Sequence, residues 1–222
     1  MVRTAILVDG GFYRKRSRTL WGEKTAEERA TELIIYCQRH LKNKDGNQER
    51  NLYRIFYYDC EPIGRKSVYN PITKKNLDLE KTETYEWSKV FLEELKKKRK
   101  VALRLGVMTD DMYYNLKPEV TKKLLANKIT LEEITEKDLM FCAKQKGVDM
   151  RIGIDIASLA YKKQVDQIIL ISGDSDFVPA AKLARREGID FILDPMYAEI
   201  RDDLFEHIDG LESHWKKKPT EN

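Results

Sequence analysis

The chain has 222 residues, of which 41% are hydrophobic and 35% are charged. This composition indicates a folded, charge-rich globular protein and excludes a disordered or fibrous one. No apolar run approaches the roughly 18–20 residues that a membrane-spanning helix needs, and the first residues lack the pattern of a secretory signal. We therefore expect a cytoplasmic protein that does not contact a membrane. The net charge of +4 is compatible with a polyanionic partner without requiring one.

Strand-like and helix-like runs alternate in the first half of the chain. Residues 4–8 (T-A-I-L-V) are apolar and precede Asp-Gly-Gly, which predicts a buried strand that ends in a tight turn. Residues 25–28 (T-A-E-E) have capping-box spacing, and apolar residues follow at helical intervals through Leu41, which predicts an amphipathic helix. The patterns that follow predict a strand over residues 53–58, a helix over 84–100 and a strand over 101–108.

The second half continues the alternation after an irregular stretch. Residues 110–138 have Leu and Ile positions that predict one or two short helices, in an insertion beside the main sheet. The elements predicted after it are a strand over residues 140–144, a helix over 149–163, a strand over 167–171, a helix from the turn at 172–176 through Arg186 that Gly188 stops, and a last strand over 189–193.

Short apolar strands that alternate with helices predict an α/β fold, with a mostly parallel central sheet flanked by helices on both faces. We expect one domain over residues 1–209 and a C-terminal tail over 210–222. Ligands of such sheets bind beyond the carboxyl ends of the strands, near a switch in strand order. This rule indicates where functional side chains should be sought.

Aspartates fall at the expected ends of these strands and starts of these helices. Asp9 follows the first strand, Asp174 and Asp176 follow the strand at 167–171, and Asp149 begins a helix. Each could instead be a turn or cap residue, but together they predict four carboxylates at one edge of the sheet. Such a group repels itself unless a cation lies within it. Oxygen ligands favour Mg²⁺ or Mn²⁺, and no Cys or His is placed to favour zinc.

Three segments carry a family resemblance: Val8-Asp9-Gly10-Gly11, Lys146-Gly147-Val148-Asp149 and Ser172-Gly173-Asp174-Ser175-Asp176-Phe177. Together they resemble the NYN domain, the LabA-like branch of the PIN-like nuclease superfamily. The S-G-D-S-D-F segment after an apolar strand is the most specific piece, and the resemblance runs from about Met1 to Asp209. It implies a PIN-like, Rossmann-like three-layer fold and a divalent-metal site that hydrolyses phosphodiester bonds, usually in RNA.

The resemblance also implies roles for individual residues. It places Asp9, Asp149, Asp174 and Asp176 at the positions of the family's catalytic acidic metal ligands. Asp155 matches a further acidic position of less defined role. It lies six residues beyond Asp149, about 120° round the helix and roughly 9 Å further along it, so both reach one ion only if the helix points along the site. Many members carry Asn where this chain has Phe12.

Basic and hydroxyl side chains near these aspartates are the expected substrate contacts. We expect Arg14, Lys15, Arg16, Arg18 and Arg151 to hold phosphates. Ser172 and Ser175 would donate hydrogen bonds to a ligand carboxylate or a phosphate, with a helix-cap role equally open for Ser175. No histidine is placed as a general base, so the ion would activate the attacking water. For Tyr13, Tyr57 and Tyr58 we favour core positions over base stacking.

The sequence leaves several alternatives open. It does not distinguish RNA from single-stranded DNA, endonuclease from exonuclease, or a monomer from a homo-oligomer. The main rival function is an RNA-binding or adaptor protein that keeps the fold with little or no turnover. Metal-dependent binding without cleavage would favour that rival.

Overall fold

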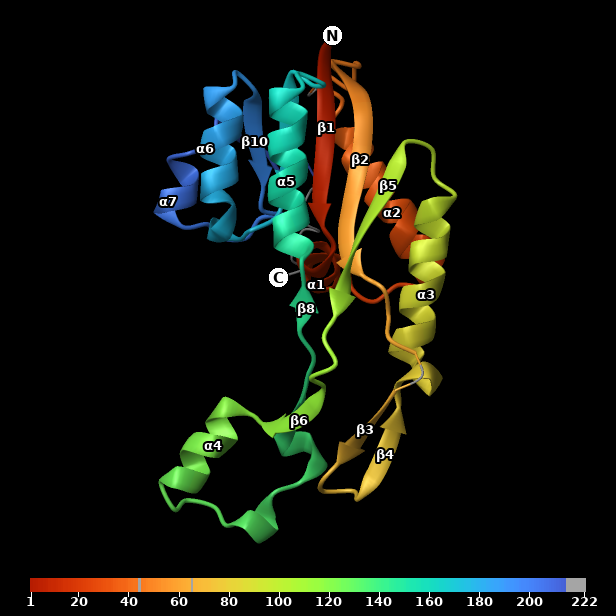
Figure 1. Ribbon diagram of the computed structural model, residues 1–222, viewed down its shortest axis with the longest axis vertical. Coiled ribbons are helices and arrows are strands. Elements are labelled where there is room, and N and C mark those ends of the chain that lie inside the picture. The colour runs from red at the N-terminus through yellow and green to blue at the C-terminus, as the bar shows by residue number, and fades with distance from the viewer. Residues whose placement is uncertain (44, 65, 215–222) are drawn as a thin grey trace, which may run out of the picture.

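A computed structural model describes residues 1–43, 45–64 and 66–214, and its centre is a seven-stranded, mostly parallel sheet (Figure 1). The strand order is β11-β10-β9-β1-β2-β5-β8, and only β8 is antiparallel to its neighbour. The strands are β1 (Val2–Asp9), β2 (Arg50–Cys60), β5 (Val101–Met108), β8 (Gln145–Lys146), β9 (Gln167–Ile171), β10 (Asp190–Asp194) and β11 (Gly210–Leu211). The expected α/β class with a mostly parallel sheet is confirmed.

Helices cover both faces of this sheet. On one face, α2 (Ala26–Arg39) and α3 (Glu83–Lys96) bury residues such as Leu33 and Phe91 in a shared apolar cluster. On the other face, α5 (Val148–Tyr161) and α6 (Val178–Arg186) bury residues such as Ile152 and Ala181. The short α7 (Asp202–Phe205) packs beside this second layer through Leu204. No helix among the described residues is both long enough and apolar enough to cross a membrane.

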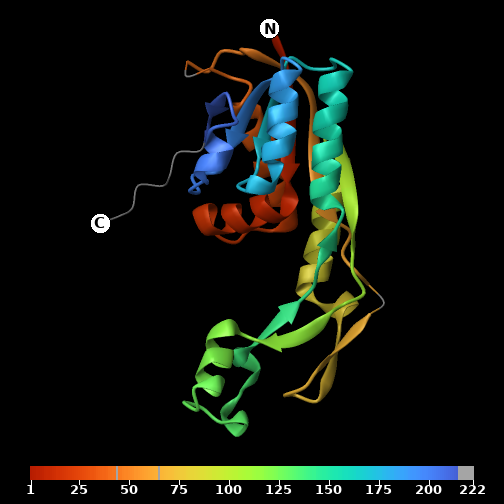
Figure 2. The same cartoon turned by 60° about the vertical axis from the view of Figure 1, so that its left-hand side comes forward.

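The first helix, α1 (Gly10–Trp21), corrects an expectation. We expected Asp-Gly-Gly to form a tight turn, but β1 runs straight into α1, and Asp9 is the N-cap residue that accepts a hydrogen bond from the Phe12 amide. Gly10 is needed there because a Cβ would lie 2.5 Å from both the hydroxyl of Tyr57 and the carbonyl oxygen of Tyr58. Figure 2 shows α1 lying across the carboxyl end of the sheet, beneath β1.

Two segments project beyond this carboxyl end (Figures 1 and 2). One is an antiparallel hairpin of β3 (Ser67–Asn70) and β4 (Lys75–Asp78), followed by a 3₁₀ turn at Leu79–Lys81. The other contains β6 (Tyr113–Leu116), α4 (Pro118–Leu125), 3₁₀ turns at Leu131–Glu133 and Glu136–Asp138, and β7 (Leu139–Cys142). Asn70 of the hairpin donates a hydrogen bond of 3.0 Å to Glu136.

The irregular stretch at 110–138 therefore contains the expected short helices, but β6 and β7 close it as an antiparallel pair. The strand expected over residues 140–144 is shifted to β7 and joins β6 rather than the main sheet. At the other end of the chain, Gly210 and Leu211 pair with β10, so the sheet continues into the segment expected as a tail. Residues 215–222 of that tail lie outside the described residues.

The strand order reverses direction beside β1. From β1 the chain moves to β2 and β5 on one side, and it then returns to β9 and β10 on the other side. The carboxyl ends of β1 and β9 therefore flank the switch in strand order, which is where parallel α/β sheets bind their ligands.

Candidate metal and nucleic-acid site

Asp9 occupies the centre of this carboxyl edge. Its Oδ1 accepts the Phe12 amide at 3.0 Å, which fixes the carboxylate at the N-terminus of α1. Its Oδ2 accepts a hydrogen bond of 3.3 Å from the buried Ser172 hydroxyl, which follows β9. The side chain is thus held between the two strands that flank the switch point.

Asp149 lies at the same edge of the sheet, at the start of a helix that covers one of its faces. It lies in the first turn of α5, which begins after Gly147. The backbone of Gly147 has φ +79°, a left-handed conformation that glycine adopts without strain. This turn connects β8 to α5, and it explains the need for glycine in the K-G-V-D segment.

Asp174 and Asp176 follow β9 in a short 3₁₀ turn, Ser175–Phe177. Asp174 is its N-cap and accepts the Asp176 amide at 3.0 Å. The Asp174 amide donates in turn to the Ser172 hydroxyl at 3.3 Å, so one serine joins Asp9 to the turn after β9. Ser175 is half-buried within the 3₁₀ turn.

The carboxylates of this group act on one another electrostatically. Burial raises the pKa of Asp9, and the charges of Asp149 and Asp59 raise it further, against the lowering effect of the Phe12 amide and Ser172 hydroxyl. Partial burial also raises the pKa of Asp149, as do the charges of Asp174 and Asp176. The structure therefore brings all four expected aspartates into one region of negative potential.

The spacing of this group limits the kind of ion that it fits. No three of these aspartates in the described chain bring one oxygen each within 4.8 Å of one another. Mg²⁺ is bound in proteins through one or two carboxylates and keeps several of its waters. In this arrangement an ion would take at most two of these carboxylates directly, and the group offers no nitrogen or sulfur ligand.

Asp59 forms a supporting network beneath the site. It lies near the end of β2 with only 2% of its side chain exposed, and it forms a 3.0 Å ion pair with Arg14 of α1. Asp59 also accepts hydrogen bonds from the hydroxyl of Tyr57 at 2.9 Å and from the side-chain amide of Gln145 at 3.2 Å. These contacts hold Arg14 at the edge of the carboxylate group.

A groove of about 660 Å³ begins at Gly11, two residues after Asp9, and runs between α1 and α3. Its basic lining residues are Arg14, Lys15, Arg18, Lys24 and Arg29. Trp87 also lines it, and acidic Glu23 and Glu83 lie among the basic residues. Arg14 is paired with Asp59 and Arg18 with Glu23, while Lys24 and the buried Arg29 both pair with Glu32. A phosphate backbone that leads to Asp9 would therefore meet the exposed Lys15 and Arg18 first.

Three other residues expected at the site are held by contacts with the surrounding structure. Asp155 accepts hydrogen bonds of 2.9 Å from the Tyr58 hydroxyl and the Arg104 guanidinium, which direct it toward β2 and β5. Arg16 donates to the carbonyl oxygen of Met196 at 2.7 Å and is not part of the groove. Arg151 is exposed, and its Nε donates to the Leu105 carbonyl oxygen at 3.0 Å.

The three tyrosines considered for base stacking are fully buried, which confirms their expected place in the core; they are Tyr13, Tyr57 and Tyr58. Sequence reasoning missed Gln145, which contacts Asp59, and the groove-lining Lys24 and Arg29, which both pair with the buried Glu32. Gln145 directly precedes the K-G-V-D segment, and this proximity was the one available signal. Lys24 and Arg29 flank the start of α2 and reach the groove only through the packing of α2 beside α1 and α3.

Phe12, which replaces a common Asn of the family, has a packing role. Its Cε2 would lie 2.8 Å from a Cβ built on Gly173. The ring of Phe12 therefore lies directly against the backbone between Ser172 and Asp174. The lack of a side chain at Gly173 lets this aromatic ring support the turn that carries the aspartates.

The NYN domain family matches residues 66–202, which are more than half of the chain. The chain belongs to the NYN domain family. NYN domains have a PIN-like fold and are typically nucleases. In this NYN protein the matched residues include Asp149, Asp174 and Asp176, whereas Asp9 precedes them.

A crystal structure of a protein of unknown function from Vibrio parahaemolyticus is similar in outline to this NYN protein. The sequences are 14% identical, the alignment covers 95% of this chain and 91% of that chain, and the TM-score is 0.46. No curated protein matches the chain.

Proposed function

We propose that this protein is a divalent-metal-dependent nuclease of the LabA-like branch, and that it hydrolyses phosphodiester bonds in single-stranded RNA. The observation that carries this proposal is the convergence of Asp9, Asp149 and Asp174 at the switch point, with raised pKa values for the first two. Mutual repulsion at a sheet edge costs stability unless a cation offsets it. A group of carboxylates that costs stability without a cation therefore favours a functional ion site.

The four aspartates would hold Mg²⁺ or Mn²⁺, which would neutralise charge on the scissile phosphate and activate a water. Asp9 and Asp174 would be the direct ligands, and Asp149 and Asp176 would complete the shell or orient the water. Ser172 orients the Asp9 carboxylate by donating to it, and it holds the backbone of Asp174 in place by accepting from the Asp174 amide. Such orienting contacts matter because a ligand that rotates away loses affinity for the ion.

The groove beside Gly11 would bind the RNA strand. Arg14 is preorganised by Asp59, while Lys15 and Arg18 are exposed along the same helix. Phosphates held there would place the next phosphodiester beside Asp9. The exposed Arg151 would contact the RNA strand on the α5 side. Ser175, in the turn after β9, would either cap the helix or contact a phosphate.

The test is cleavage of end-labelled single-stranded RNA and DNA with Mg²⁺, Mn²⁺ or EDTA. We expect metal-dependent cleavage of RNA, and at least about a hundredfold loss of rate in Asp174→Asn. Asp202→Asn is the matched control, since it changes an exposed aspartate of α7 outside the site. Circular dichroism verifies that both variants are folded.

Failure to cut any substrate, with RNA binding that still requires the metal, would support the adaptor function instead. Preferential cleavage of DNA would show that the proposed substrate is wrong and that the proposed nuclease activity is right. Cleavage by Asp174→Asn at the wild-type rate would contradict the assigned site.

A further inference from the structure

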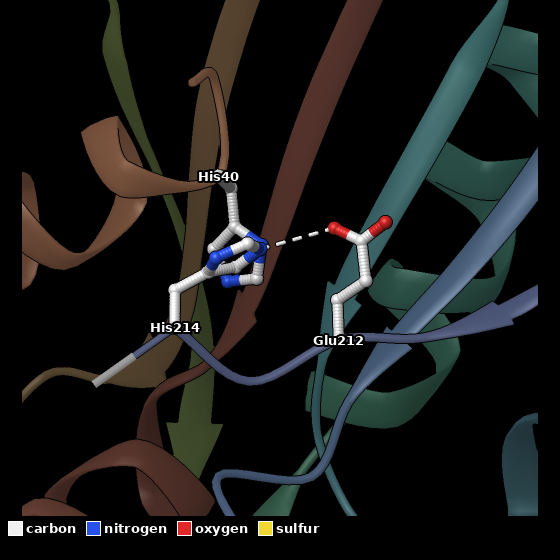
Figure 3. A group of neighbouring side chains, drawn as sticks. All are labelled: His40, Glu212 and His214. Carbon is white, nitrogen blue, oxygen red and sulfur yellow. Dashed lines mark hydrogen bonds and ion pairs between the residues drawn. The ribbon is translucent and has the colours of Figure 1, made fainter. Parts of the chain in front are cut away.

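A second group of potential metal ligands lies away from the aspartates. His40 at the end of α2, together with Glu212 and His214 after β11, can each offer one ligand atom, and these three atoms lie within 4.8 Å of one another (Figure 3). They are the only such group of His, Cys, Asp or Glu in the described part of the chain. Two of the three histidines of the protein take part.

His40 is fully buried and is oriented by a carboxylate. Its Nε2 lies 2.7 Å from Oδ2 of the buried Asp194. Asp194 also accepts hydrogen bonds from the Tyr36 hydroxyl, the Ser213 hydroxyl and the Met196 amide. A carboxylate that accepts the proton of one imidazole nitrogen fixes the ring and leaves the other nitrogen with a lone pair, as in the carboxylate–histidine arrangements behind metal ligands.

The other nitrogen of His40 is without a partner. Its Nδ1 is buried and has no hydrogen-bond partner in the structure. A buried polar atom left unsatisfied costs stability. A bound ion would satisfy it, which a purely structural His40–Asp194 pair does not do.

Glu212 and His214 are already close to the geometry that an ion requires. The His214 Nε2 and Glu212 Oε2 lie 3.1 Å apart, whereas two ligand atoms of a tetrahedral zinc ion at about 2.0–2.1 Å are separated by about 3.3 Å. Arg50 donates to both oxygens of Glu212 and holds the carboxylate in place.

We propose that His40, His214 and Glu212 form a zinc site that ties the end of α2 to the segment after β11. Two imidazoles and one carboxylate are a borderline donor set that suits Zn²⁺ rather than Mg²⁺. His214 and Glu212 are 31% and 27% exposed, so the ion enters from solvent and a water takes the fourth position. No local sequence pattern indicates this site, because its ligands lie near opposite ends of the chain.

Histidine NMR of the full chain tests this directly, because it contains three histidines. Long-range ¹H–¹⁵N spectra are recorded with and without one equivalent of zinc sulfate, with Mg²⁺ present. The imidazole signals of His40 and His214 shift together, and those of His207 stay in place. The same response in Asp174→Asn separates this site from the carboxylate group, so either proposal can fail alone.

Substitution provides the second arm. His214→Gln, at a half-exposed position, abolishes the zinc response of His40 and lowers zinc affinity by at least about tenfold. His207→Gln is the matched control and binds zinc as the wild type does. Zinc that leaves the His40 signals unchanged, or binds His214→Gln as tightly as wild type, overturns the proposal.

Discussion

Gly173 and Phe12 provide a test of how packing supports the site. A Cβ on Gly173 would lie 2.8 Å from Cε2 and 3.3 Å from Cζ of Phe12, and contacts shorter than about 3.4 Å are repulsive. Gly173→Ala therefore forces the ring or the turn after β9 to move. Because the turn carries Asp174, the substitution connects packing to the arrangement of the carboxylates.

The magnitude follows from two opposing effects. Overpacking costs about 1–3 kcal/mol, whereas Gly→Ala at a position that tolerates alanine stabilises by about 0.4–1 kcal/mol through the unfolded state. The net expectation for Gly173→Ala is a loss of about 0.5–2 kcal/mol. Phe12→Ala removes every atom that the new Cβ would strike, so in that background the same substitution should be neutral or stabilising.

Urea unfolding of four proteins measures this: wild type, Gly173→Ala, Phe12→Ala and the double variant. We expect a coupling free energy of about 1–3 kcal/mol between the two positions, with a change of sign for Gly173→Ala between backgrounds. Additive effects would refute the assigned contact. Additivity means that Gly173→Ala destabilises both backgrounds equally, and this result would place its cost in the backbone of the turn instead.

Three further predictions concern the charges and hydrogen bonds of the site. Ser172→Ala should lower the cleavage rate by about 10–100-fold while the protein stays folded, because Asp9 and the Asp174 amide lose their shared partner; an unchanged rate would show that the hydroxyl is dispensable. Asp9→Asn keeps the helix cap and removes an ionised group whose pKa is raised in the folded protein, so in EDTA at pH 7 it should melt at or above the wild-type temperature. That difference should vanish as the pH falls through the raised pKa toward the unfolded value of about 4, and a variant that melts well below wild type at pH 7 would contradict the repulsion. Lys15→Ala should weaken RNA binding in EDTA and reduce its log–log salt slope by about 0.7, whereas Lys182→Ala on the exposed surface of α6 should not; equal effects would argue against the groove.

Much of the fold was predictable because strong periodic patterns agree with the tertiary structure. The strand at 167–171 is buried at every residue, and the capping box at Thr25 begins α2 as predicted. In contrast, α1 was missed because Gly10 and Gly11 are typical of a turn, and its R-K-R-S-R sequence lacks a clear apolar face. The hairpin of β3 and β4 was missed because most of its side chains are exposed, so burial imposes little alternation on its sequence.

The same distinction applies to the candidate site. The aspartates could be placed together because each follows a strand or begins a helix, and those positions meet at one edge of a parallel sheet. The contact of Arg14 with Asp59 depends on how α1 lies against β2. The contact of Arg16 with the Met196 carbonyl oxygen depends on the loop after β10. Contacts of this kind arise from tertiary packing and leave no local pattern in the sequence.

The most direct test of the central claim is one parallel set of Mn²⁺-dependent cleavage rates on the same labelled RNA, for five Asp→Asn variants. Substitution at positions 9, 149, 174 and 176 should each reduce the rate, by at least about a hundredfold at the two direct ligands, Asp9 and Asp174. Asp155→Asn should stay within several-fold of wild type, because Asp155 is held by Tyr58 and Arg104. A rate for Asp155→Asn as low as that of Asp174→Asn, or full activity without the direct ligands, would contradict the account.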